Sequence, residues 1–201
     1  MKYLSYVISF LFHPIWFPIY GTMLFLLAVP VFLPIEEMKN AWTLLVIASV
    51  AAPTLLYLIL YTINWIDSPF AVSAEKRKWV LYGYISLLVI IALKIITIDK
   101  YPILYLYIIN LALGCFIIIF MQFFKLLGSL PVMLMGGITG FAVFLSIFYN
   151  IDLLYVISTL VFISGLVASS QIYLFGKKLL VCFLSWIIGF LPQICLLWLK
   201  F

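Results

Sequence analysis

The chain has 201 residues, of which 68% are hydrophobic and only 8% are charged. A water-soluble domain carries roughly 25% charged residues, so this composition excludes a soluble globule. The formal net charge of +5 comes from scattered loop lysines rather than from a basic face, and binding to nucleic acid is not expected. The three cysteines lie in apolar runs without a pairing or ligand spacing, so no metal or cofactor site is predicted.

Apolar runs long enough to span a bilayer, about 20 residues each, follow one another along the chain. They predict an all-α, polytopic transmembrane helical bundle that forms a single domain over residues 1–201. Because proline ends or kinks a helix, the run interrupted by His13-Pro14 is read as an interfacial helix over 2–13 and a first span over 15–34. A cleaved signal peptide fits less well, since no small-residue cleavage site follows the apolar region.

Charged and proline-rich breaks mark the remaining spans. They are predicted at 42–64, 79–98, 103–123, 129–148, 153–174 and 179–199. The total is about seven spans, with six as the alternative count. Seven spans place the amino terminus and the loops after spans two, four and six on one side, which carries seven basic residues against four on the other. The positive-inside rule puts that side in the cytoplasm, although an anion bound by these residues would confound the rule.

Three groups of basic and polar residues lie on this one side. An even number of crossings separates each group from the next, and cations with the free N–H groups of helix starts can hold a phosphate. The predicted phosphate- or lipid-binding residues are Lys76, Arg77, Lys78, Lys125, Ser129, Gln171 and Lys177. The alternative is that these residues only flank the spans, as topology alone requires.

Several short motifs follow one another in a characteristic order along the chain. They are Phe12-His13-Pro14, Pro18-Ile19-Tyr20-Gly21, the basic cluster before the third span, Ser129 ahead of Gly136-Gly137, and Gly189-Phe190. From about residue 11 to 193 the chain resembles the type 2 phosphatidic acid phosphatase superfamily, and within it a branch found in Bacteroidetes-type bacteria. The resemblance implies a helical bundle of the bacterial inner membrane that handles phosphate-bearing lipids.

The catalytic motifs of that superfamily are degenerate here. The first motif matches only as the basic cluster, without its proline. In the second motif Ser129 matches, but Pro131 occupies the place of the histidine. In the third motif Gln171 stands where the arginine belongs, and Lys177 stands where the nucleophilic histidine belongs. A phosphohistidine route needs a nucleophilic imidazole and a second group that protonates the leaving alkoxide.

The chain has one histidine, His13, which is a weak catalytic candidate because it cannot play both roles. The resemblance therefore implies a catalytically inactive homologue that binds an anionic lipid headgroup or a membrane protein partner, which includes a second copy of the chain. One alternative is an active phosphatase of altered mechanism, acting on phosphatidic acid, phosphatidylglycerol phosphate or a polyprenyl diphosphate. Another is a structural subunit of a membrane complex. Ion-coupled transport is disfavoured, since no acidic residue lies deep in a span.

Small and polar residues inside the spans predict close helix packing. Gly136-Gly137-x-x-Gly140 lets helices approach one another. Asn110 and Gln193 are expected to form hydrogen bonds between helices, with a role in lining a site as the alternative.

Overall fold

The computed structural model describes residues 2–29, 35–62, 74–124 and 126–198, and this part of the chain is helical without a strand. In chain order the elements are α1 (Lys2–Leu11), η1 (Pro14–Trp16), α2 (Phe17–Ala28), α3 (Ile35–Val46), η2 (Ile47–Ala51), α4 (Ala52–Thr62), α5 (Ala74–Lys94), α6 (Pro102–Phe123), α7 (Leu130–Tyr149), α8 (Leu154–Phe175), α9 (Leu179–Cys195) and η3 (Leu196–Trp198). The all-helical class expected from the sequence is therefore observed.

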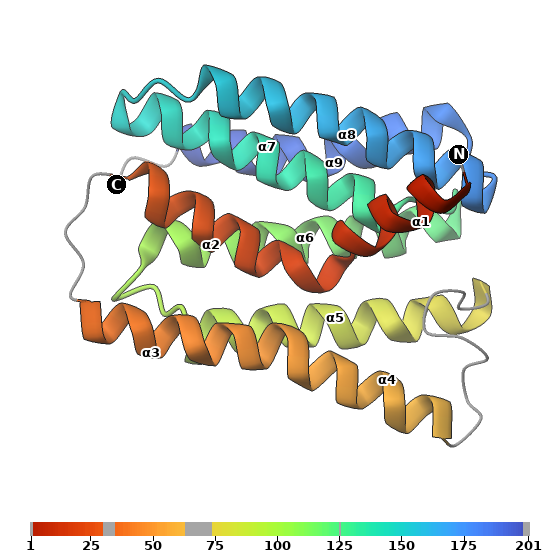
Figure 1. The fold of residues 1–201 in the computed structure, drawn as a ribbon, viewed down its shortest axis with the longest axis horizontal. Coiled ribbons are helices and arrows are strands. Elements are labelled where there is room, and N and C mark those ends of the chain that lie inside the picture. The colour runs from red at the N-terminus through yellow and green to blue at the C-terminus, as the bar shows by residue number, and fades with distance from the viewer. Residues whose placement is uncertain (1, 30–34, 63–73, 125, 199–201) are drawn as a thin grey trace.

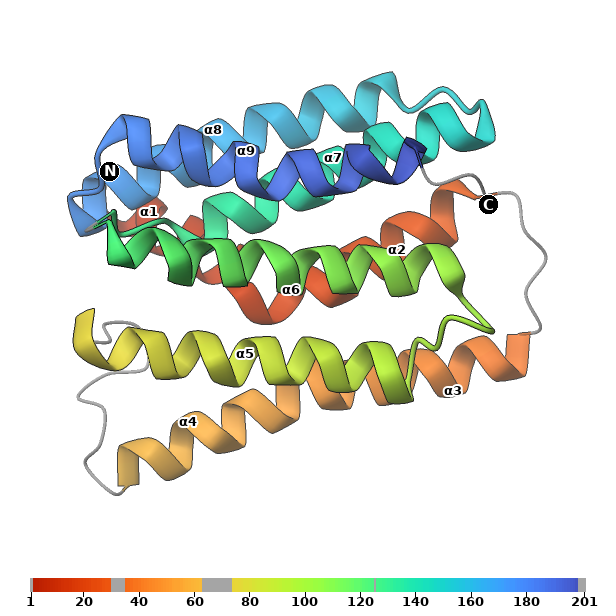
Figure 2. The same cartoon turned by 180° about the vertical axis from the view of Figure 1, so that it is seen from behind.

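The helices run lengthwise and successive passes alternate in direction (Figures 1 and 2). The first pass is made by α1 and α2, the second by α3 and α4, and each later helix makes one pass. The starts of α5 at Ala74, α7 at Leu130 and α9 at Leu179 therefore lie at the same end of the molecule, beside the start of α1 (Figure 1). We call this end the basic end.

Helix ends follow local backbone chemistry. Pro102 and Pro131 lie in the first turns of α6 and α7, where a missing N–H leaves no helical bond unmade. Asn150 and Gly176, with φ of 52° and 60°, end α7 and α8 in the left-handed conformation that closes a helix. These two residues turn the chain sharply between α7, α8 and α9.

Five helices in the described part of the chain are long and apolar enough to cross a membrane. They are Tyr3–Ala28, Pro102–Gln122, Leu130–Tyr149, Leu154–Phe175 and Leu179–Trp198. The apolar part of α5, Trp79–Lys94, is shorter. The structure thus supports a protein with several membrane-spanning helices. It does not establish the expected count of about seven, because the spans predicted at 42–64 and 79–98 are not among the five.

The amino-terminal segment differs from the expected interfacial helix and separate first span. A continuous apolar stretch from Tyr3 to Ala28 is long enough to cross as one span, and α1 packs along α8 (Figure 1). Pro14 ends the α-helical bonding, as expected for proline, but the chain makes only the short η1 before α2 continues. The predicted end of this span, over 30–34, lies outside the described residues.

The second predicted span is helical up to Thr62, where the described part ends, but the helix is interrupted. Pro53 lacks an N–H and cannot bond to the carbonyl of Ser49, four residues earlier. Hydrogen bonding is widened at this point into the π-helical turn η2, in which the N–H of Ala52 donates to the oxygen of Ile47. The interruption explains why α3 and α4 do not form a single long helix.

The closest packing in the molecule joins α7 and α9. A Cβ added at Gly136 would lie against the backbone oxygen of Trp186, and one added at Gly140 would lie 2.7 Å from that of Phe190. From the other helix, a Cβ at Gly189 would meet the backbone oxygen of Met133. Gly136 meets Trp186 and, four residues later, Gly140 meets Phe190, so the residue numbers rise together on both helices and α7 and α9 are parallel. Small residues permit this backbone contact, as in other membrane helix pairs.

Two polar side chains join α6 to α9 inside the bundle. The Nδ2 of Asn110 donates to the oxygen of Pro192 at 2.9 Å, and the Nε2 of Gln193 donates to the oxygen of Tyr107 at 3.2 Å. The oxygen of Pro192 is available to Asn110 because it lies near the end of α9. There the N–H of Leu196 donates to the oxygen of Gln193 rather than to that of Pro192. The interhelical hydrogen bonds expected for Asn110 and Gln193 are confirmed.

Replacing Gly189 by alanine should lower the free energy of unfolding by about 1–3 kcal/mol, because the new methyl group meets a backbone atom that cannot rotate away. Gly165→Ala is the matched control, since nothing lies within 4 Å of its Cβ position. Thermal unfolding in detergent micelles should show a lower midpoint for Gly189→Ala alone. Equal midpoints for the two variants would contradict this account of the α7–α9 contact.

Candidate functional site

The start of α7 is attached to α9 by a buried hydrogen bond. Ser129 precedes α7 as its N-cap residue and is fully buried. Its backbone N–H donates to the Oγ of Ser185 at 2.9 Å, and that hydroxyl in turn donates to the oxygen of Val181 at 2.7 Å. Ser185 is fully buried as well. The position of Ser129 is therefore determined by α9 and by the glycine contacts that hold α9 against α7.

The side chain of Ser129 forms a hydrogen bond with a third helix, α8. Its hydroxyl donates to the Oε1 of Gln171 at 3.3 Å, and only 4% of Gln171 is exposed. Gln171 lies in the penultimate turn of α8, close to the basic end. Two residues that the sequence analysis selected, separated by 42 positions, thus form a direct side-chain hydrogen bond.

Lys177 brings a positive charge to the same place. It lies in the turn between α8 and α9, directly after Gly176. Its Nζ donates to the oxygen of Leu127 at 2.7 Å and to that of Gly128 at 3.4 Å. These carbonyls belong to the segment that leads into Ser129. The bonds hold the ammonium group beside the start of α7, at a half-buried position.

We call Ser129, Gln171, Lys177 and Ser185 the serine–lysine cluster. It is built where two parallel helices, α7 and α9, begin and where α8 ends. The start of a helix carries a partial positive charge and N–H groups without helical partners. Two helix starts and one ammonium group therefore act in the same sense, and together they favour a negatively charged group at this end of the bundle.

The other predicted binding residues are placed less fully. Lys76, Arg77 and Lys78 belong to the first turns of α5, which begins at the same end of the molecule (Figure 2). The side chains of these three residues, and Lys125, lie outside the described part of the structure.

The single histidine is separated from the basic end by the length of α1. His13 follows the ten residues of α1, a helix about 15 Å long by its rise per residue. It is the N-cap of η1, and its Nδ1 accepts a hydrogen bond from the N–H of Ile15 at 3.5 Å. This position matches the structural role of a histidine beside proline at a helix start.

Ser185 was not selected from the sequence, although it anchors Ser129. A serine in an apolar helix is usually read as a small residue that bonds to its own helix. A signal was nevertheless present, since Ser185 lies four residues before Gly189 and shares its helix face. That face packs against α7, so a polar group on it meets the start of α7.

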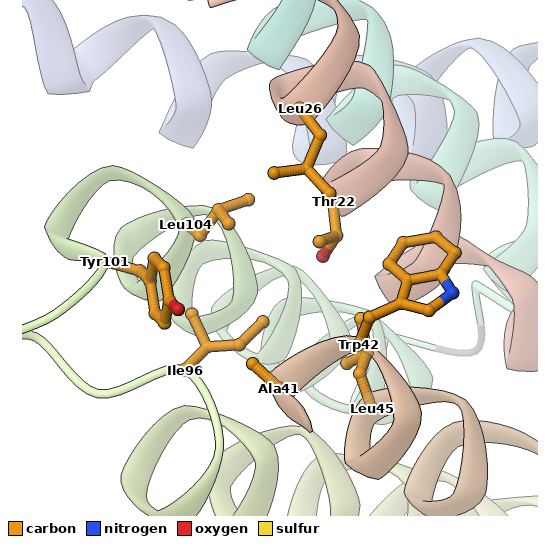
Figure 3. A pocket seen from close by; sticks show the side chains of 8 residues that line it. All are labelled: Thr22, Leu26, Ala41, Trp42, Leu45, Ile96, Tyr101 and Leu104. Carbon is orange, nitrogen blue, oxygen red and sulfur yellow. The ribbon is translucent and has the colours of Figure 1, made fainter. Parts of the chain in front are cut away.

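A small cavity lies toward the opposite end, between α2, α3 and α6 (Figure 3). Its volume of about 20 Å³ is enough for one water molecule. Most of its lining is apolar, including Leu45 and Ile96, and the hydroxyl of Thr22 donates to the oxygen of Pro18 at 2.8 Å. The cavity is too small for a lipid headgroup, so the serine–lysine cluster is the stronger candidate site.

Comparisons with known proteins leave the family open: no protein-family model, no curated protein and no solved structure matches the chain.

Ser185→Ala should destabilise the protein by about 1–3 kcal/mol, because it leaves the buried N–H of Ser129 without its acceptor. Amide hydrogen exchange over residues 126–132 should become faster as the start of α7 loosens. Ser169→Ala is the control: that serine also bonds to the carbonyl four residues back, at 2.8 Å, but it is exposed. Equal effects of the two substitutions on exchange and stability would contradict the anchoring role.

Proposed function

We propose that this protein is an integral membrane protein that binds the phosphate-bearing headgroup of an anionic lipid at its basic end, without catalysing phosphate release. The observation that carries the proposal is the serine–lysine cluster. It gathers hydroxyl, amide and ammonium groups from three helices and a turn around two helix starts.

The resemblance to the phosphatidic acid phosphatases gains support from this convergence. Ser129 corresponds to the second motif of that superfamily, and Gln171 and Lys177 correspond to the third. In an unrelated bundle, residues matched to these motifs by sequence need not contact one another. Here Ser129 and Gln171 share a hydrogen bond, and Lys177 contacts the residue before Ser129. The proposed ancestry is thus a phosphatase-like bundle that kept its phosphate-facing end.

The proposed mechanism of binding is electrostatic and local. Lys177 is already ordered by the carbonyls of Leu127 and Gly128, so little side-chain entropy is lost when an anion arrives. Helix-start N–H groups of α7 and α9 add donors.

Catalysis is not part of the proposal because the required groups are missing from the cluster. Phosphoryl transfer through histidine needs a nucleophilic imidazole and a proton donor. The chain's one histidine caps η1, and a lysine must lose its proton before it can attack phosphorus. The Nζ of Lys177 is also engaged in hydrogen bonds to two backbone carbonyl oxygens.

The proposed location is the inner membrane of a bacterium, with seven crossings. The pass made by α3 and α4 and the pass made by α5 would join the five longer helices, since both run the length of the bundle (Figure 2). Seven crossings would put the basic end on one side of the membrane, where it would meet the headgroups of a single leaflet.

Lys177→Glu should reduce the binding of phosphatidic acid by at least about tenfold, the effect of losing one charge-assisted hydrogen bond. Lys178→Glu is the control, because it makes the same charge change at the adjacent exposed position. Retention of phosphatidic acid over phosphatidylcholine would be measured by native mass spectrometry of protein released from nanodiscs. Lys177→Arg should retain most of the binding.

Equal losses for Lys177→Glu and Lys178→Glu would show a diffuse charge effect and would overturn the proposed site. Thermal unfolding of each variant separates lost binding from lost folding, since Lys177 also holds the α6–α7 turn.

No phosphate release is expected from the purified protein in nanodiscs that contain phosphatidic acid, phosphatidylglycerol phosphate or undecaprenyl diphosphate. The reason is the missing imidazole at the cluster. The measurement is inorganic phosphate against time, with Lys177→Ala and His13→Ala variants as references. Turnover by the parent protein above both references would reject the inactive assignment and would require another nucleophile.

A further inference from the structure

A hollow lies beside the break in the first span. α1 packs along α8, whereas α2 leaves that course after Pro14 and packs against α7 and α6. The divergence opens a groove between the first span, α7 and α8 whose volume is about 350 Å³. Leu11 and Leu24 line it from the first span, Ile138 from α7 and Leu160 from α8.

The walls of the groove are apolar. Its one hydroxyl group, on Tyr20, already donates to the oxygen of Leu11 at 2.9 Å. An apolar cavity of about 150 Å³ stays dry and accepts a hydrocarbon instead, and this groove has more than twice that volume. Its chemistry therefore selects a hydrocarbon occupant over water or a polar ligand.

The dimensions distinguish a single chain from a helix. Its walls on α7 and α8 are short, since the lining residues lie within Met135–Ile138 and Val156–Leu160, about one helical turn each. Two turns of a partner helix about 10 Å across would need roughly 850 Å³, more than twice the volume of about 350 Å³.

The position of the groove indicates which molecule fills it. It lies between Tyr3–Ala28 and Leu154–Phe175, two helices long and apolar enough to cross a membrane. Leu11 and Met23, on its rim, are 48% and 49% exposed, so the groove opens to the surface of the bundle. In a membrane, that surface faces the acyl chains of the surrounding lipids.

We propose that this groove binds one acyl chain of a membrane lipid as a defined site rather than as part of the general lipid shell. The bound chain would fill the space left by the break at Pro14 and would join α2 to α8. The inference stands on the groove alone and does not require the headgroup site at the basic end.

The test is photo-crosslinking in nanodiscs of phosphatidylcholine that carries a diazirine on one acyl chain. Crosslinked peptides should concentrate on residues 11–24, 135–138 and 156–160. Ile138→Trp, which fills the groove, should reduce this labelling at least fivefold. Phe162→Trp is the control, since Phe162 is 68% exposed on α8 and does not line the groove.

Because Ile138 is 5% exposed and its replacement can disturb folding, Val156→Trp at the rim serves as a second blocking variant. Labelling spread evenly over exposed residues such as Ile90 and Phe116, or unchanged in both blocking variants, would overturn the proposal. Crosslinks between two protein copies at the groove would also overturn it, in favour of a protein occupant.

Phosphatidylcholine has no net charge, so Lys177→Glu should leave groove labelling unchanged. Failure of the groove proposal is thereby separated from failure of the headgroup proposal.

Discussion

The backbone contact between α7 and α9 is the constraint on which the candidate site depends. Glycines on both helices bring the two backbones together, and only this approach lets the hydroxyl of Ser185 reach the N–H of Ser129. Because α7 also packs against α2, α6 and α8, 78% of its apolar stretch is buried, against 33% for α9. Without a water-driven hydrophobic effect inside a bilayer, such close packing and the hydrogen bonds it permits carry most of the association between helices.

Much of this arrangement could be predicted from the sequence. Composition determined the helical membrane class, because 8% charged residues cannot cover a soluble surface. Glycine spacing indicated tight packing at Gly136 and Gly140, and intramembrane Asn110 and Gln193 were expected to join helices. Because an even number of crossings separates their segments, Ser129, Gln171 and Lys177 were expected at one end, and the structure has them there.

The parts that could not be predicted depend on backbone detail and on tertiary contacts. Pro14 was expected to separate two helices and the span at 42–64 was expected to run through Pro53, yet η1 lets the first span continue and η2 widens one turn of the second. Proline removes one hydrogen bond, and the surrounding packing decides whether the chain turns away or bridges the gap. Ser185 was missed for a related reason: its spacing from Gly189 indicates the helix face on which it lies, but not that it meets Ser129, 56 residues away.

The parallel pairing of α7 and α9 has a consequence for biosynthesis. Two parallel neighbours need a return pass between them, and α8 supplies it on the outside of the bundle (Figure 1). During translation, at about 5–20 residues per second, α7 enters the membrane well before its partner has been made. Its glycine face must therefore contact lipid or an insertion factor until residues beyond Gly189 leave the ribosome. The serine–lysine cluster accordingly cannot assemble before α9 has been made, because a chain that stops before α9 lacks Ser185, the acceptor for the N–H of Ser129.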